Sequence, residues 1–107
     1  MESVSSDARA GANSLRRLRI SFEGEVQGVG FRWTSRKVAN DLSLTGWVRN
    51  EPDGSVSMEL QGPSAQLGAF FTLFDRSYAN YPIRYIIAEK DDIAPIPGEA
   101  GPFMVRF

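Results

Sequence analysis

The chain has 107 residues, enough for one domain with a single two-layer core and too few for two cores of any size. It contains no Cys and no His, which excludes disulfides, thiolate or imidazole nucleophiles and the zinc sites that depend on these side chains. With 12 basic and 13 acidic side chains the net charge is −1, so no strong positive field indicates nucleic-acid binding.

Residues 1–14 carry mostly small and polar side chains and no apolar run long enough for a signal peptide or a membrane span. So little apolar surface cannot offset the entropy cost of ordering the segment. We therefore expect a flexible N-terminal tail over residues 1–14, a single domain over residues 15–107, and a cytoplasmic protein that does not contact a membrane.

Strands and a helix are predicted in the first half of the domain. Apolar residues at every second position predict a strand that ends at Gly24, and apolar residues at helical spacing then predict a helix over residues 31–42. Residues 44–50, the turn sequence at 51–54 and the alternating residues 56–60 predict a β-hairpin.

A second helix and two more strands are predicted in the second half. Pro63 fits the first position of a helix. The apolar stripe of this helix consists of Leu67, Phe70, Phe71, Phe74 and Tyr78. Alternation predicts strands over residues 83–88 and 103–107, and the prolines and glycines of residues 92–102 predict an irregular loop between them.

The order strand, helix, strand, strand, helix, strand is that of the split βαβ or ferredoxin-like arrangement, with two helices on one face of an antiparallel sheet. A last short strand can join an edge of this sheet. The predicted fold class is therefore α+β, a ferredoxin-like two-layer sandwich of βαββαβ order with an additional short edge strand. Because this fold carries many unrelated functions, the function has to be argued from individual residues.

A glycine-rich segment, residues 24–32, connects the first strand to the first helix. Its three glycines permit backbone conformations that other residues avoid, and the free amides of the following helix N-terminus favour an anion. The segment fits neither the nucleoside-triphosphate loop nor the dinucleotide fingerprint, and the glycines alone indicate a plain turn. Arg32 adds a planar fork of donors beside this loop, which suits a phosphate.

Two residues have a simpler interpretation when each is taken alone. A single surface arginine such as Arg32 is usually a solvated charge, and an asparagine before a turn, such as Asn50, is usually a turn residue.

Taken together, however, the segments around Arg32 and Asn50 resemble the acylphosphatase family. The family pattern Gly-x-Val-Gln-Gly-Val-x-Phe-Arg corresponds to residues 24–32, and Gly-Trp-Val-x-Asn corresponds to residues 46–50. The resemblance spans about residues 15–107 and implies a ferredoxin-like fold, in agreement with the order of elements.

The resemblance implies an enzyme that hydrolyses the carboxyl–phosphate bond of acyl phosphates to a carboxylate and inorganic phosphate. It implies catalytic roles for Arg32 and Asn50, with Asn50 orienting the attacking water, because an amide is not a base near neutral pH. The implied phosphate-binding residues are Gln27, Gly28, Val29, Gly30 and Arg32. Ser35 resembles the small hydroxyl residue of the family one helical turn after the arginine, where we expect it to support the site.

No metal ion or cofactor is expected, because a carboxylate is a good leaving group and the reaction needs mainly positioning and charge stabilisation. The expected partners are a small acyl phosphate substrate and inorganic phosphate, which is both a product and a competing ligand. We expect a monomer that binds no nucleic acid. Glu51 follows Asn50, and its place in a turn predicts that its carboxylate points into solvent.

Two other functions occur on the same fold. An RNA-binding module of the same fold would present aromatic residues on its central strands, but residues 55–60 contain none. We expect Trp33, Trp47 and the phenylalanines of the second helix to belong to the core. A non-catalytic phosphate-binding or accessory domain, like the acylphosphatase-like segment of larger carbamoyl-transfer proteins, would also keep Arg32 and the glycine-rich loop, so this alternative stays open.

Overall fold

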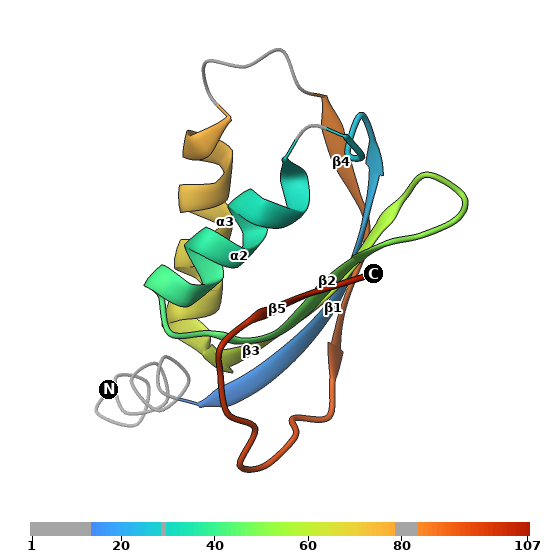
Figure 1. Ribbon diagram of the computed structural model, residues 1–107. Helices are drawn as coiled ribbons and strands as arrows, with labels where there is room; N and C mark the ends of the chain where they lie inside the picture. The colour runs from blue at the N-terminus through green and yellow to red at the C-terminus, as the bar shows by residue number, and fades with distance from the viewer. Residues whose placement is uncertain (1–13, 29, 79–83) are drawn as a thin grey trace, which may run out of the picture.

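The computed structural model describes residues 14–28, 30–78 and 84–107 (Figure 1). These residues form the strands β1 (Leu15–Gly24), β2 (Thr45–Asn50), β3 (Val56–Pro63), β4 (Tyr85–Ile93) and β5 (Met104–Arg106), and the helices α2 (Phe31–Asp41) and α3 (Ser64–Ser77). The tail expected over residues 1–14 lies outside the described residues apart from Ser14. The start of the domain therefore stays a prediction.

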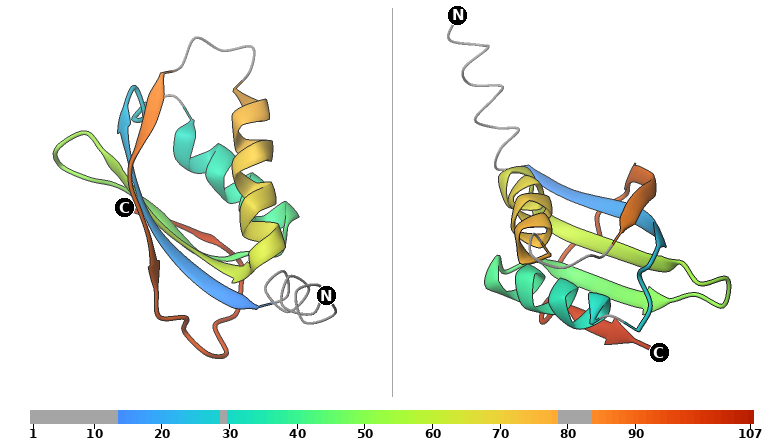
Figure 2. Two further views of the ribbon diagram at one scale, coloured as in Figure 1. Left: turned by 180° about the vertical axis from the view of Figure 1, so that it is seen from behind. Right: turned by 90° about the horizontal axis from the view of Figure 1, so that it is seen from above.

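The five strands form one sheet in the order β4-β1-β3-β2-β5. The first four in this order are antiparallel, as the ferredoxin-like prediction requires, whereas β5 runs parallel to β2 and makes the sheet mixed. Both helices cover the same face of the sheet (Figures 1 and 2). The predicted two-layer α+β fold is confirmed. Neither helix is both long enough and apolar enough to span a membrane.

The core lies between this face of the sheet and the helices. Alternation along β1 directs Leu18, Ile20 and Phe22 into it, where each is almost fully buried. The ring of Phe31, the first residue of α2, lies with its centroid 4.9 Å from that of Phe22 and 4.7 Å from that of Phe74 on α3. These edge-to-face contacts hold the beginning of α2 against the sheet.

The predicted core was wrong at Trp33, whose side chain is 49% exposed. Trp33 follows Phe31 by two residues, which places it about 200° around the helix from the buried face. Its ring instead packs under the guanidinium of Arg36, 4.4 Å from the ring centroid. Trp47 is half-buried and contacts Arg106. Four members of the α3 stripe are buried as predicted, and Phe71 is only partly buried against the core; the four are Leu67, Phe70, Phe74 and Tyr78.

The boundaries of α3 and β4 differ from the predictions in ways that the strand pairing explains. Pro63 pairs with Leu15 as the last residue of β3 and keeps an extended backbone, so α3 begins one residue later, at Ser64. Strand β4 continues to Ile93, into the segment expected to be irregular, because its residues pair with β1 as far as Arg17. Ile83, where this strand was expected to begin, lies outside the described residues.

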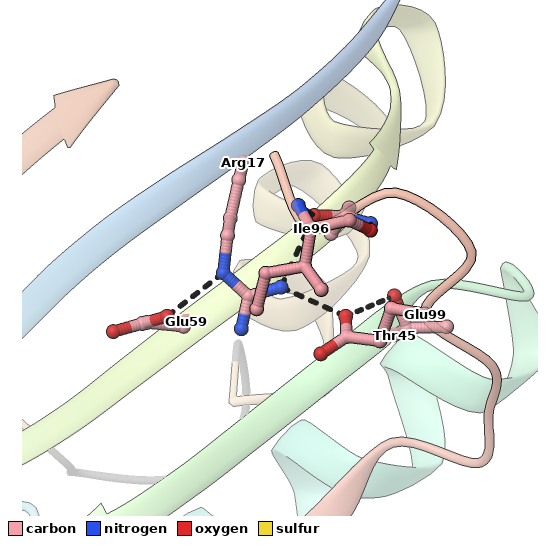
Figure 3. Close-up of polar contacts among 6 residues, drawn as sticks. Arg17, Thr45, Glu59, Ile96 and Glu99 are labelled. Atoms are coloured by element: carbon pink, nitrogen blue, oxygen red, sulfur yellow. Dashed lines mark hydrogen bonds and ion pairs between the residues drawn. The ribbon is translucent and has the colours of Figure 1, made fainter. Parts of the chain in front are cut away.

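The outer face of the sheet, opposite the helices, carries a buried arginine (Figure 3). Arg17, Gln61 and Thr45 form one row across β1, β3 and β2, as their register shows. Residues 94–103 cross this row: the Gln61 side-chain amide donates to the Ile96 carbonyl at 2.8 Å and accepts from the Ile96 amide at 2.8 Å. This contact fixes the path of the chain from β4 to β5.

Carboxylates surround the Arg17 guanidinium. Its Nε donates to Glu59 at 2.8 Å and its Nη1 donates to Glu99 at 2.8 Å, and Glu99 also accepts from the Thr45 hydroxyl at 2.6 Å. Burial raises the pKa of Glu99, but the hydrogen bonds from Thr45 and Arg17 lower it more, so the pKa of this carboxyl lies below its ordinary value. Glu99 therefore stabilises the fold in its ionised form.

Because the folded-state pKa of Glu99 lies below the unfolded value of about 4.3, its contribution is present above that pH and is lost as the pH falls through the folded-state pKa. We expect Glu99→Gln to destabilise the protein by about 1–2 kcal/mol at pH 7. The difference in Tm between wild type and variant should stay constant down to about pH 5 and shrink below about pH 4.

Thermal melting between pH 3 and pH 7 measures this difference. The matched control is Asp92→Asn, because the Arg16–Asp92 ion pair is exposed and solvent screens it. A Tm difference for Glu99→Gln that does not vary with pH would contradict the role given to its charge.

Candidate functional site

The segment between β1 and α2 is a tight loop of unusual backbone conformation. Gly28 and Gly30 have φ angles of +78° and +76°, in the left-handed region that favours glycine. A Cβ atom added at either position would meet no described atom within 4 Å, so the backbone conformation, and not lack of space, requires glycine there. A loop of this kind can turn successive amides toward one point. Val29, the remaining predicted loop residue, lies outside the described residues.

Helix α2 begins at Phe31 with Gly30 as its N-cap residue. Gly30 has no side chain to cap the helix, and no acidic residue lies in the first turn. The amides of that turn and the positive end of the helix dipole therefore face the loop without a carboxylate to neutralise them. This is the arrangement that binds anions at helix N-termini.

Arg32 lies in the first turn of α2 and is half-buried. Its Nη1 donates a long hydrogen bond of 3.4 Å to the Arg106 carbonyl, and its guanidinium lies 5.0 Å from the centroid of the Phe107 ring. Arg32 forms no ion pair with any carboxylate in the described parts of the chain. Most of its five donors are thus available to an anion beside the loop.

The side chain of Gln27 ties the loop to the turn between β2 and β3. Its Nε2 donates to the carbonyl of Glu51 at 2.8 Å and to that of Ser55 at 2.9 Å. The same Ser55 carbonyl accepts the Glu51 amide at 2.9 Å, which closes the turn. The resemblance implies only that Gln27 binds phosphate, and the contact of its side chain with the turn is not part of that expectation. An amide side chain within an otherwise glycine-rich and apolar loop was the available signal for this contact.

Asn50 is the last residue of β2 and precedes the turn that Gln27 holds. Its Oδ1 is buried and has no hydrogen-bond partner among the described residues. Leaving such an acceptor unpaired costs about 1–3 kcal/mol, so the structure keeps a hydrogen-bonding site here at the expense of stability.

Strand β5 connects Arg32 with the end of β2. Arg106 pairs with Arg49, the neighbour of Asn50, and the Arg106 carbonyl accepts a hydrogen bond from Arg32. Both catalytic candidates therefore lie at the same end of the sheet.

Two further expectations concern Glu51 and Ser35. Glu51 does not simply point into solvent: its carboxylate lies 3.0 Å from the Arg49 Nε, and hydrogen bonds from Ser57 and Arg49 hold the pKa of Glu51 below its ordinary value. Arg49 thus compensates its negative charge. The Ser35 hydroxyl is buried and donates to the Phe31 carbonyl at 2.7 Å, so it acts within the first turn of α2.

No group of three or more carboxylates within the described parts of the chain is placed to hold a metal ion. A hollow of about 430 Å³ on the outer sheet face, lined in part by Arg19, Ser57 and Asp91, holds none of the predicted site residues. The glycine loop, the start of α2 and the end of β2 are thus the elements that bring those residues together.

Known proteins are similar to this chain over most of its length. The family model described as Acylphosphatase matches residues 18–95. An acylphosphatase of an Arthrobacter species is 41% identical over 92 residues, which cover 85% of this chain and 81% of the relative. The acylphosphatase of Oceanobacillus iheyensis is 45% identical over 56 residues, or 52% of this chain. The match spans 62% of the length of that relative.

Solved structures of acylphosphatases and of a larger protein share the fold of this chain. The crystal structure of acylphosphatase from Bacillus subtilis superposes with a TM-score of 0.69 at 28% identity, covering 88% of this chain and 100% of that one. Full-length HypF, in a phosphate- and nucleotide-bound form, superposes with a TM-score of 0.65 at 26% identity. The match covers 88% of this chain but only 12% of HypF.

The Gln27 contact predicts a stability effect that the backbone of the loop alone would not give. Gln27→Ala removes both hydrogen bonds to the turn and should destabilise the protein by about 1 kcal/mol, a fall in Tm of about 4–8 °C. Thermal melting beside Gln66→Ala, a glutamine on α3 without such contacts, measures the effect. Equal Tm values for the two variants would show that Gln27 does not hold the turn.

Proposed function

The chain belongs to the acylphosphatase family, and on this basis we propose that it hydrolyses the carboxyl–phosphate bond of acyl phosphates to a carboxylate and inorganic phosphate. The observation that carries the proposal is the meeting of three features at one end of the sheet. These are the glycine loop at an uncapped helix N-terminus, Arg32 without an ion pair to a described carboxylate, and the unpaired Oδ1 of Asn50.

In this proposal the phosphoryl group binds at the beginning of α2. The loop amides from Gln27 to Gly30, Val29 included, donate to its oxygens, and Arg32 meets two of them with its planar fork. Positive charge from the guanidinium and the helix dipole stabilises the charge on the equatorial oxygens in the transition state. The exposed side of Gly28 and Gly30, where no described atom lies close, admits the ligand.

Asn50 orients the attacking water, which donates a hydrogen bond to the Asn50 Oδ1. The water oxygen bonds to phosphorus, the bond to the carboxylate oxygen breaks, and the carboxylate leaves with the electron pair. The proton released by the water passes to an oxygen of the phosphoryl group, because the Asn50 amide cannot accept it. The products are a carboxylate and inorganic phosphate.

We propose that the reaction needs no metal ion, since Arg32 and the amides supply the charge stabilisation that a metal gives elsewhere. Inorganic phosphate is then both a product and a competing ligand. A monomeric state and a cytoplasmic location stay predictions.

A second candidate is a non-catalytic domain that binds phosphate. The structural match to 12% of full-length HypF favours it, because the fold of this chain also occurs there as a small part of a larger protein. The two candidates differ in turnover: the non-catalytic domain would bind phosphate and leave acyl phosphates intact.

The test is hydrolysis of benzoyl phosphate by the full chain in excess EDTA. We expect turnover without added metal, and a loss of about 10²- to 10³-fold in kcat for Asn50→Ala, because the water is no longer oriented. Inorganic phosphate should still raise the Tm of Asn50→Ala, since its anion-binding groups are intact.

Three results would count against parts of this proposal. Activity that needs Mg²⁺ contradicts the metal-free mechanism. A normal kcat in Asn50→Ala removes Asn50 from the site. Phosphate-dependent melting without turnover in the wild type favours the non-catalytic domain.

A further inference from the structure

A groove of about 230 Å³ lies between α2 and β5, beside the proposed phosphate site. Trp33, Arg36 and Asn40 line it from the helix, at the spacing that places residues on one helical face. From the other side it is lined by Phe103, Val105 and Phe107, which alternate along the strand segment and so share one face. Figure 2, seen from above, shows α2 lying along β5, with the C-terminal end of the chain beside the beginning of the helix.

The groove carries apolar surface that the fold itself does not bury. Trp33 is 49% exposed and Phe107 is 91% exposed. Both side chains line the same groove, Trp33 from the helix and Phe107 from the C-terminal segment. A contiguous patch of exposed apolar side chains marks a ligand-binding site more often than single exposed apolar residues do. The guanidinium of Arg36 stacks on Trp33 and fixes the orientation of its ring.

One end of the groove meets the phosphate site. Phe107 contacts the Arg32 guanidinium, so a group bound along the groove begins where Arg32 would hold the phosphoryl oxygens. The other end is closed, because Asn40 accepts the Phe103 amide at 2.8 Å and donates to the Phe103 carbonyl at 3.5 Å. From Trp33 to Asn40 the helix rises about 10 Å, which is long enough to accommodate an aryl or medium-length acyl group.

The amide of Asn40, one of the two polar side chains along the groove, is already engaged. Both ends of the Asn40 amide bind the Phe103 backbone, and Arg36 covers the Trp33 ring. An apolar acyl group loses no hydrogen bonds to water when it enters the groove. A hydroxylated or amide-bearing group does lose them, and of the two polar side chains that line the groove it can regain hydrogen bonds from Arg36 but not from Asn40.

We propose that this groove binds the acyl group of the substrate, and that the chain acts preferentially on acyl phosphates with an aromatic or medium-length aliphatic acyl group. The inference rests on the proposed function, since it places the acyl group relative to a phosphoryl group held at Arg32. The bound substrate then extends from the beginning of α2 along the helix toward Asn40.

The test compares kcat/KM for acetyl, butyryl, hexanoyl and benzoyl phosphate. In the wild type we expect kcat/KM to rise about threefold for each methylene that enters the groove, and to be highest for hexanoyl and benzoyl phosphate. Trp33→Ala, and independently Phe107→Ala, should lower the ratio of kcat/KM for benzoyl over acetyl phosphate by about tenfold. Ile96→Ala is the control, because Ile96 is 47% exposed but lies outside the groove.

The outcomes separate this inference from the proposed function. Equal kcat/KM for all four substrates, or an unchanged benzoyl-to-acetyl ratio in both variants, overturns the groove assignment while hydrolysis itself stands. A fall of the ratio in Ile96→Ala as large as in Trp33→Ala also overturns it. Hydrolysis of none of the four substrates overturns the proposed function, and this inference with it.

Discussion

The ring of Phe31 packs edge-to-face against Phe22 and Phe74, and this contact fixes the point at which α2 begins. The position of the glycine loop follows from it, because the loop has to join the end of β1 to a helix whose first residue is locked in the core. Arg32 is the next residue along the chain, so the same contact directs its guanidinium to the surface beside the loop. A buried apolar side chain thus positions a charged one.

The other half of the site is fixed from the sheet. Gln27 holds the turn after β2, and Arg106 in β5 accepts a hydrogen bond from Arg32 while its strand pairs with β2. Strand β5 reaches this position because residues 94–103 are fastened to the outer face around Arg17 (Figure 3). An ion-pair network on the face opposite the helices therefore contributes to the placement of a strand beside the site.

The sequence was sufficient for the order of the elements and for the segments that carry the candidate site, because periodicity and loop motifs are local properties. It was insufficient where distant segments decide. Arg17 lies on the sheet face opposite the helices and is buried there, where residues 94–103 cross the face and Glu99 binds its guanidinium. The parallel pairing of β5 depends on the path of the same segment. Trp33 is exposed because its angle on the helix directs it away from the core, which its aromatic character alone does not reveal. The Gln27 side chain joins a turn more than 20 residues away.

In the proposed mechanism Arg32 holds a phosphoryl group by its geometry as well as by its charge. Lysine keeps the charge but replaces the planar fork with a flexible point charge. The most direct measurement is kcat/KM for benzoyl phosphate in Arg32→Lys, compared with Arg32→Ala and with the exposed control Arg76→Lys on α3. The expected result is a loss of about 10- to 100-fold in Arg32→Lys, close to that of Arg32→Ala, with no loss in Arg76→Lys. A near-normal rate in Arg32→Lys would contradict the assignment of Arg32 to the phosphoryl group.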